Sequence, residues 1–143
     1  MNLVSQEDFL VKPGNFNVTD GLVLMRLACG LFMLPHAFGK FANGAPAAGT
    51  VAFFEKVGFT PAELWVWIAG GSELTFATLL VLGICTRWAA LGLASVMAVA
   101  VYSVFALKGF VWMSTQGGFE YAAFFCVMLL SLVVMEFRRK PLF

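Results

Sequence analysis

Four stretches of the chain are strongly apolar, and polar or small residues separate them. The stretches cover residues 21–41, 63–85, 88–107 and 119–137. An α-helix needs about 20 predominantly apolar residues to cross the hydrocarbon core of a bilayer. The pattern therefore predicts four transmembrane spans at these positions.

A further apolar segment, residues 48–60, is too short to cross a membrane. Glu55 and Lys56 lie on one side of it, and Gly58 and Pro61 are residues that end helices. Its apolar residues recur near helical spacing on another side: Val51, Phe53, Phe54 and Val57. We expect a short amphipathic helix at the membrane interface, with an ordinary loop as the alternative.

The polar segments divide the chain into three parts. Residues 1–19 form an N-terminal arm, residues 20–137 a four-span membrane domain, and residues 138–143 a basic tail. The link at residues 85–87 is so short that the second and third spans must be adjacent and antiparallel. The predicted fold class is all-α, an integral membrane four-helix bundle with a short interfacial helix between spans one and two.

Composition supports a membrane protein. The chain is 61% hydrophobic and only 12% charged, with a mean hydropathy of +0.89. A soluble domain would be about half apolar and about a quarter charged. The net charge of +1 does not favour nucleic acid, so the lipid bilayer is the expected partner and nucleic acid is not.

Basic residues in the loops and at the ends of the spans indicate an orientation. The side of the membrane that carries both termini has five of them: Lys12, Arg87, Arg138, Arg139 and Lys140. The other side has three: Lys40, Lys56 and Lys108. By the positive-inside rule both termini are expected in the cytoplasm.

Several ionisable residues lie inside or at the edge of the spans, where each costs a few kcal/mol to insert and usually has a partner. They are Arg26, His36, Lys40, Glu73, Lys108 and Glu120. On a continuous first helix, Arg26, His36 and Lys40 would share one face, which should point into the bundle. Depth in the membrane favours a buried Arg26–Glu73 pair, with His36 reaching Glu73 from the outer side. Lys40, Lys108 and Glu120 all fall near the outer surface and could form a second cluster.

This set of charges has two interpretations. The groups neutralise one another and fix the helix register, as buried pairs often do. Alternatively, they line a polar pocket that opens to the outer face and is walled by phenylalanines. In that pocket His36 could exchange a proton near neutral pH, and the headgroup of a quinone could bind.

Metal chemistry is not favoured by the sequence. His36 is the single histidine, and the three cysteines, Cys29, Cys85 and Cys126, form no CxxC motif. A tightly held haem or metal ion needs a richer set of ligands. We therefore expect no bound metal or haem and no disulfide framework, and a quinone is the candidate cofactor.

An ordered set of residues resembles the DoxX family over roughly residues 20–137. The set comprises Arg26-Leu27, Gly30-Leu31, His36 and Gly39-Lys40, then Glu73 with residues 79–90, and finally Gly118-Phe119-Glu120. The resemblance implies a four-helix protein of the bacterial inner membrane. It places the arginine, histidine and lysine of the family on Arg26, His36 and Lys40, and its glutamates on Glu73 and Glu120.

The resemblance also suggests a function. Some DoxX-like proteins belong to redox complexes, including thiosulfate:quinone oxidoreductase, and distant relatives act as assembly helpers. Many members carry a histidine late in the third span, whereas residues 101–105 of this chain contain none. That departure argues against any role that requires two histidines.

Two functional hypotheses follow. In the first, the chain is a small subunit of a respiratory or redox complex, with other membrane subunits as partners and no redox centre of its own. It would support quinone-linked electron transfer through a site lined by Arg26, His36, Lys40, Glu73 and Glu120, so it is at most a subunit of an enzyme. In the second, it is a non-catalytic structural or assembly subunit that docks on a larger membrane complex.

Overall fold

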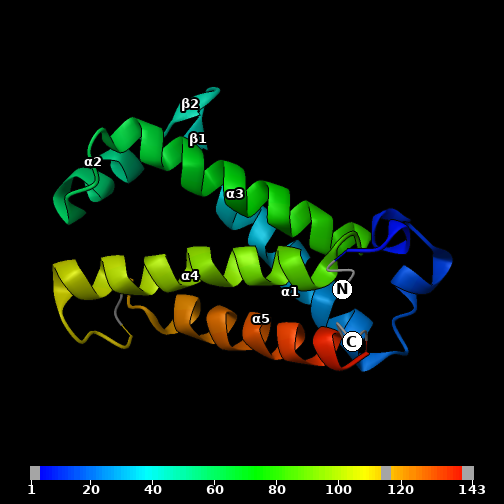
Figure 1. Cartoon of the computed structure of the whole chain (residues 1–143). Helices are drawn as coiled ribbons and strands as arrows, with labels where there is room; N and C mark the ends of the chain where they lie inside the picture. The colour runs from blue at the N-terminus through cyan, green and yellow to red at the C-terminus, as the bar shows by residue number, and fades with distance from the viewer. Residues whose placement is uncertain (1–3, 114–116, 140–143) are drawn as a thin grey trace.

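The computed structural model describes residues 4–113 and 117–139. In that part of the chain four long helices are each apolar enough to cross a membrane (Figure 1). They are α1 (Gly21–Phe38), α3 (Ala62–Leu82), α4 (Thr86–Lys108) and α5 (Glu120–Arg139). The predicted all-α membrane bundle with four spans is therefore confirmed.

The smaller elements lie between and before the spans. The arm contains two 3-10 turns, Gln6–Phe9 and Pro13–Phe16. Strands β1 (Phe41–Ala42) and β2 (Ala45–Pro46) form an antiparallel hairpin, and α2 (Ala48–Val57) follows it. The segment expected to form a short helix is thus helical, and it ends at Gly58, whose positive φ of 101° suits a left-handed helix cap.

The first span is shorter than expected, and this changes where Lys40 lies. Helix α1 ends at Phe38, and the hairpin turn at Asn43-Gly44 has φ angles of 52° and 79°. An Asn-Gly pair favours such a two-residue turn, which competes with continuation of the helix. Lys40 therefore lies after the helix, and the expectation that it shares a helical face with Arg26 and His36 is wrong.

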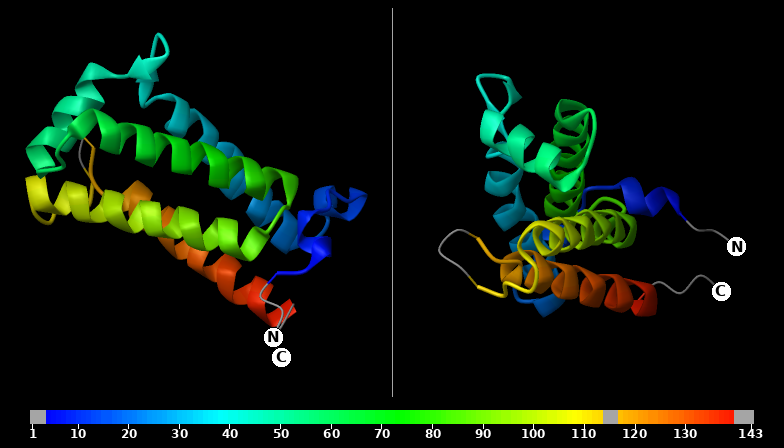
Figure 2. Two further views of the ribbon diagram at one scale, coloured as in Figure 1. Left: turned by 45° about the horizontal axis from the view of Figure 1, so that its top comes forward. Right: turned by 90° about the vertical axis from the view of Figure 1, so that its left-hand side faces the viewer.

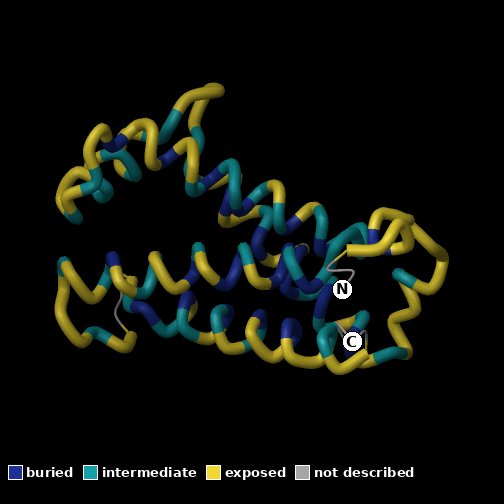
Figure 3. The backbone as a smooth tube through the Cα atoms, in the orientation of Figure 1, coloured by how far each residue is buried: buried dark blue, intermediate teal, exposed yellow. Residues whose placement is uncertain are grey.

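The four long helices pack as two pairs. Helix α1 lies along α3 and α4 lies along α5, while α2 contacts α3 and α4 (Figures 1 and 2). Buried and exposed residues alternate along each of the four helices (Figure 3). The two pairs meet closely where the arm lies, which we call the arm end, and diverge toward α2, which we call the α2 end (Figures 1 and 2).

Polar contacts close the arm end. Asp20 caps α1 by accepting a hydrogen bond from the Leu22 backbone N–H at 2.9 Å, and both of its carboxylate oxygens lie 3.0 Å from the Arg139 guanidinium. Asp8 lies 3.7 Å from buried Arg87, and its backbone carbonyl accepts from the Cys85 N–H at 2.7 Å. The arm and the end of α5 are thereby attached to the helices they adjoin.

Gly30 allows close packing of α1 on α3, which leads to a first prediction. A Cβ at Gly30 would lie 2.8 Å from Val81 Cγ2 and 2.9 Å from the Ala77 carbonyl oxygen, whereas one at Gly71 would meet nothing within 4 Å. Gly30→Ala should therefore lower the free energy of unfolding in detergent by about 1–3 kcal/mol. Gly71→Ala, the matched control, should be neutral or stabilising by up to about 1 kcal/mol. Equal melting temperatures for the two variants would contradict this packing.

Asp20 gives a second prediction, on pH dependence. The Leu22 backbone N–H, followed by the Arg139 side chain, lowers the pKa of the Asp20 carboxyl below its ordinary value of 3.8. The ionised carboxylate therefore stabilises the folded protein above that value, and this contribution is lost as the pH falls through the lower folded pKa. Asn at this position still caps a helix, so Asp20→Asn removes the charge alone.

The measurement is the melting temperature of wild type and Asp20→Asn in a non-ionic detergent between pH 2 and pH 7. Wild type should be the more stable protein above about pH 4, and the difference should shrink toward zero in acid. A difference that is constant over the whole pH range would show that the carboxylate charge does not stabilise the fold.

Candidate functional site

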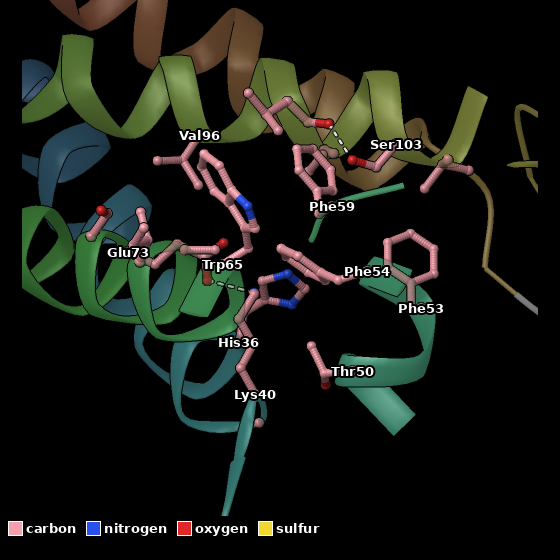
Figure 4. Close-up of a pocket in the computed structure, with 18 of the residues that line it drawn as sticks. His36, Lys40, Thr50, Phe53, Phe54, Phe59, Trp65, Glu73, Val96 and Ser103 are labelled. Carbon is pink, nitrogen blue, oxygen red and sulfur yellow. Dashed lines mark hydrogen bonds and ion pairs between the residues drawn. The ribbon is translucent and has the colours of Figure 1, made fainter. Parts of the chain in front are cut away.

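A cavity of about 840 Å³ lies between the two helix pairs near the α2 end (Figure 4). Its walls come from the end of α1, from α2, from the halves of α3 and α4 nearest to α2, and from the start of α5. Most of the lining is apolar. The lining side chains that carry polar atoms are His36, Lys40, Thr50, Trp65, Ser72, Glu73, Ser103 and Tyr121.

An ion pair joins Lys40 to Glu73 at this cavity. The Lys40 Nζ lies 2.6 Å from Glu73 Oε2, and the two side chains are only 14% and 2% exposed. A pair this buried requires good geometry, because each charge loses its hydration. Among the described residues, the Glu73 carboxylate is the one hydrogen-bond acceptor found for the Lys40 ammonium, which has three N–H groups.

The hairpin positions Lys40. The Lys40 carbonyl accepts a hydrogen bond from the Ala47 N–H at 2.9 Å, across the base of the hairpin. Phe41, the next residue, packs on Trp67 with ring centroids 4.8 Å apart and also contacts Gly70, where any Cβ would overlap its ring. Gly70 lies one turn before Glu73 on α3, so this packing directs the Lys40 side chain toward the carboxylate.

Arg26 does not reach the cavity, and the predicted Arg26–Glu73 pair is wrong. Its guanidinium donates to the backbone carbonyls of Leu80 and Asn15, and to that of Val81 at 3.1 Å. The last carbonyls of a helix have no intrahelical partner and carry partial negative charge, so they attract a cation. Since α3 runs antiparallel to α1, the end of α3 lies at the depth of Arg26. Lys40 occupies the place beside Glu73 instead.

His36 lies at the cavity together with the ion pair. Its imidazole is open to the cavity, and Figure 4 shows it beside the Lys40 side chain. The ring packs against Tyr121 of α5 at a centroid distance of 5.2 Å, and Tyr121 packs on Phe125 at 4.7 Å. The structure thus brings together His36, Lys40 and Glu73, three of the five residues that the sequence singled out.

Glu120 lies next to the site without lining it. It is the first residue of α5, and a Cβ on Gly118 would overlap its Oε2 atom. That oxygen is buried and has no hydrogen-bond partner among the described residues. The predicted cluster of Lys40, Lys108 and Glu120 is wrong for Lys40, because Lys40 pairs with Glu73. Lys108 donates a hydrogen bond to the Gly117 carbonyl at 2.9 Å.

An aromatic stack covers the cavity toward the α2 end, and we call it the aromatic roof. It consists of Phe53 and Phe54 on α2, Phe59 in the following loop and Trp65 on α3. Ring centroids are 5.5 Å apart for Phe54 and Phe59, and 5.4 Å apart for Phe59 and Trp65. Phenylalanine walls were expected, but their origin in α2 was not.

Sequence reasoning missed several lining residues. Tyr121 follows Glu120 directly, and only the charged neighbour was selected. Trp65 stands near the start of a span, where tryptophan usually marks the membrane interface. Thr50 and Ser103 are single hydroxyl residues in apolar segments, and nothing in their spacing distinguishes them. Among the described residues no three His, Cys, Asp or Glu side chains are placed to share a metal ion.

The Lys40–Glu73 pair gives a third prediction. Lys40→Met or Glu73→Gln alone leaves one buried group without its counter-charge, and each should lower the free energy of unfolding by about 3 kcal/mol. The double variant removes both charges and should lose clearly less than the sum of the two single losses. Lys56→Met on the exposed side of α2 is the matched control and should be nearly neutral. Additive losses in thermal or denaturant unfolding would show that the pair is not coupled.

Comparisons with known proteins agree with the earlier resemblance. The DoxX family model matches residues 21–106, a segment that contains Arg26, His36, Lys40 and Glu73. A protein of Haemophilus influenzae described as uncharacterized is 37% identical over 73 residues, which are 51% of this chain and 47% of that relative. The alignment thus spans about half of the relative, and no solved structure matches. The family model matches more than half of the residues of this chain, and the chain therefore belongs to the DoxX family.

Proposed function

We propose that this DoxX-family protein is an accessory subunit of a membrane redox complex and that its cavity binds the headgroup of a quinone. The observation that supports this most is the buried Lys40–Glu73 pair at an otherwise apolar cavity of about 840 Å³. Ligand pockets are commonly apolar, of about 300–1,000 Å³, with a few polar groups that orient the ligand.

The polar groups match the two redox forms of a quinone. A quinone ring is apolar on its faces and carries carbonyl oxygens that accept hydrogen bonds. The Lys40 ammonium, the His36 imidazole and the Tyr121 hydroxyl are donors at the cavity. The Glu73 carboxylate accepts, and it would receive a hydroxyl of the reduced form.

Proton and electron balance assigns different tasks to this chain and its partners. Reduction of a quinone to a hydroquinone takes two electrons and two protons. The electrons would come from a redox centre in another subunit, because these side chains are not electron donors. His36 and Glu73 would take up two protons from water and pass one to each quinone oxygen, since imidazole and carboxyl groups exchange protons readily. Oxidation of the hydroquinone would return the two protons to the same groups.

The location is part of the same proposal. Arg87, Arg138 and Arg139 gather at the arm end, which would face the cytoplasm of a bacterium across its inner membrane. The α2 end and the cavity would then lie toward the outer half of the bilayer. Other membrane subunits would contact the exposed outer faces of the four spans.

A fourth prediction tests the cavity directly. Ala100 lines the cavity on α4, whereas Ala98 on the same helix is exposed and does not line it. Ala100→Phe should fill part of the cavity and weaken binding of a short-chain quinone to the purified protein in nanodiscs by at least about tenfold, equivalent to about 1.4 kcal/mol. Ala98→Phe adds the same ring on the other side and should bind as wild type does.

Melting temperatures of both variants would show whether the folds are comparable. If wild type binds no quinone, or if Ala100→Phe leaves both quinone binding and turnover of the assembled complex unchanged, the proposed site is wrong. A structural role in assembly would then remain, and neutralising Lys40 and Glu73 together should change the yield of complex but not the turnover per complex.

A further inference from the structure

Two apolar residues of the cavity wall, on facing helices, are strongly exposed. Ile68 on α3 and Val99 on α4 both line the cavity, yet they are 45% and 49% exposed. They lie on the two helices that diverge toward the α2 end (Figure 1). The exposed part of the cavity wall therefore includes apolar residues on the side between α3 and α4, which we call the opening.

The depth of this opening places it in hydrocarbon. At 1.5 Å per residue, Ile68 lies about 9 Å from the start of α3 and Val99 about 14 Å from the end of α4. The hydrocarbon core of a bilayer is about 30 Å thick, so both residues lie below the headgroup region. The medium outside the opening is lipid acyl chains.

The chemistry of the cavity changes from one side to the other. At the opening the side chains are Ile68, Val96 and Val99, which have no polar atoms. The charged groups Lys40 and Glu73, together with His36, come from the end of α1 and from the α1-facing side of α3. The aromatic roof covers the route toward the α2 end. A bound molecule would thus meet polar groups at one end and an apolar exit at the other.

We infer that the ligand is a lipid with a long hydrocarbon tail, which enters from the bilayer between α3 and α4 and leaves its tail in this opening. The inference rests on the proposed function and adds to it the path by which the ligand enters and the hydrocarbon tail of the ligand. A cavity of about 840 Å³ also exceeds what a single six-membered ring requires, so it has room for the first part of a tail. Continuity with the lipid-facing surface of α3 and α4 makes hydrocarbon the occupant of the opening.

The test compares two probes with the same benzoquinone headgroup, one carrying a ten-carbon alkyl tail and one carrying no tail. Binding is measured in nanodiscs, with concentrations expressed per lipid so that partitioning into the membrane is removed. Val99→Trp narrows the opening, and Ile68→Trp narrows it from the opposite helix. Val134→Trp on α5 is the matched control, because Val134 is 50% exposed and does not line the cavity.

We expect Val99→Trp and Ile68→Trp to weaken binding of the tailed probe by at least about tenfold and that of the tail-less probe by less than about threefold. Val134→Trp should behave as wild type with both probes. Equal effects on the two probes, or no effect on either, would overturn the lateral route while leaving the headgroup site in place. Failure of both probes to bind wild type would overturn the proposed function itself, together with the inference that rests on it.

Discussion

The ion pair between Lys40 and Glu73 is the constraint on which the α2 end of this protein depends. A carboxylate in the middle of an apolar helix is costly, and Glu73 is tolerated because an ammonium lies 2.6 Å away. That ammonium comes from outside the helix, through a turn that needs α1 to end early and Phe41 to pack over Gly70. The ion pair, together with the packing of Phe41, therefore joins the hairpin after α1 to the middle of α3.

The two ends of the bundle use their charges differently. At the arm end, Arg26 donates to three backbone carbonyls and Asp20 pairs with Arg139, so these groups hold elements together. At the α2 end, the ion pair joins only the α1/α3 pair and leaves the α4/α5 pair free to diverge. The cavity lies between the two helix pairs at that end.

The sequence was sufficient for the spans and for much of the site. Apolar length alone predicts four helices, and the cost of a charge in lipid selects His36, Lys40 and Glu73. The hydrogen-bond partners of these residues were harder to predict. Arg26 donates to backbone carbonyls at the end of α3, and backbone groups are present at every position, so the sequence does not mark them. The Asn43-Gly44 pair did carry the signal that displaces Lys40 from the helix. The roles of Tyr121 and of the aromatic roof depend on how helices meet in space, and spacing along the chain does not contain that information.

The ion pair between Lys40 and Glu73 can have a structural and a functional role at the same time. A salt bridge that only fixed register would be most stable with every donor satisfied, since buried polar groups are costly when unpaired. Within the described part of the chain, Lys40 has one acceptor for three N–H groups, and it lies at a cavity rather than in a sealed core. The ion pair thus compensates the charge of Glu73 and leaves N–H groups of Lys40 available to a molecule in the cavity. An acceptor oxygen on a bound molecule would add a hydrogen bond to Lys40, so binding at the proposed site would also stabilise this end of the fold.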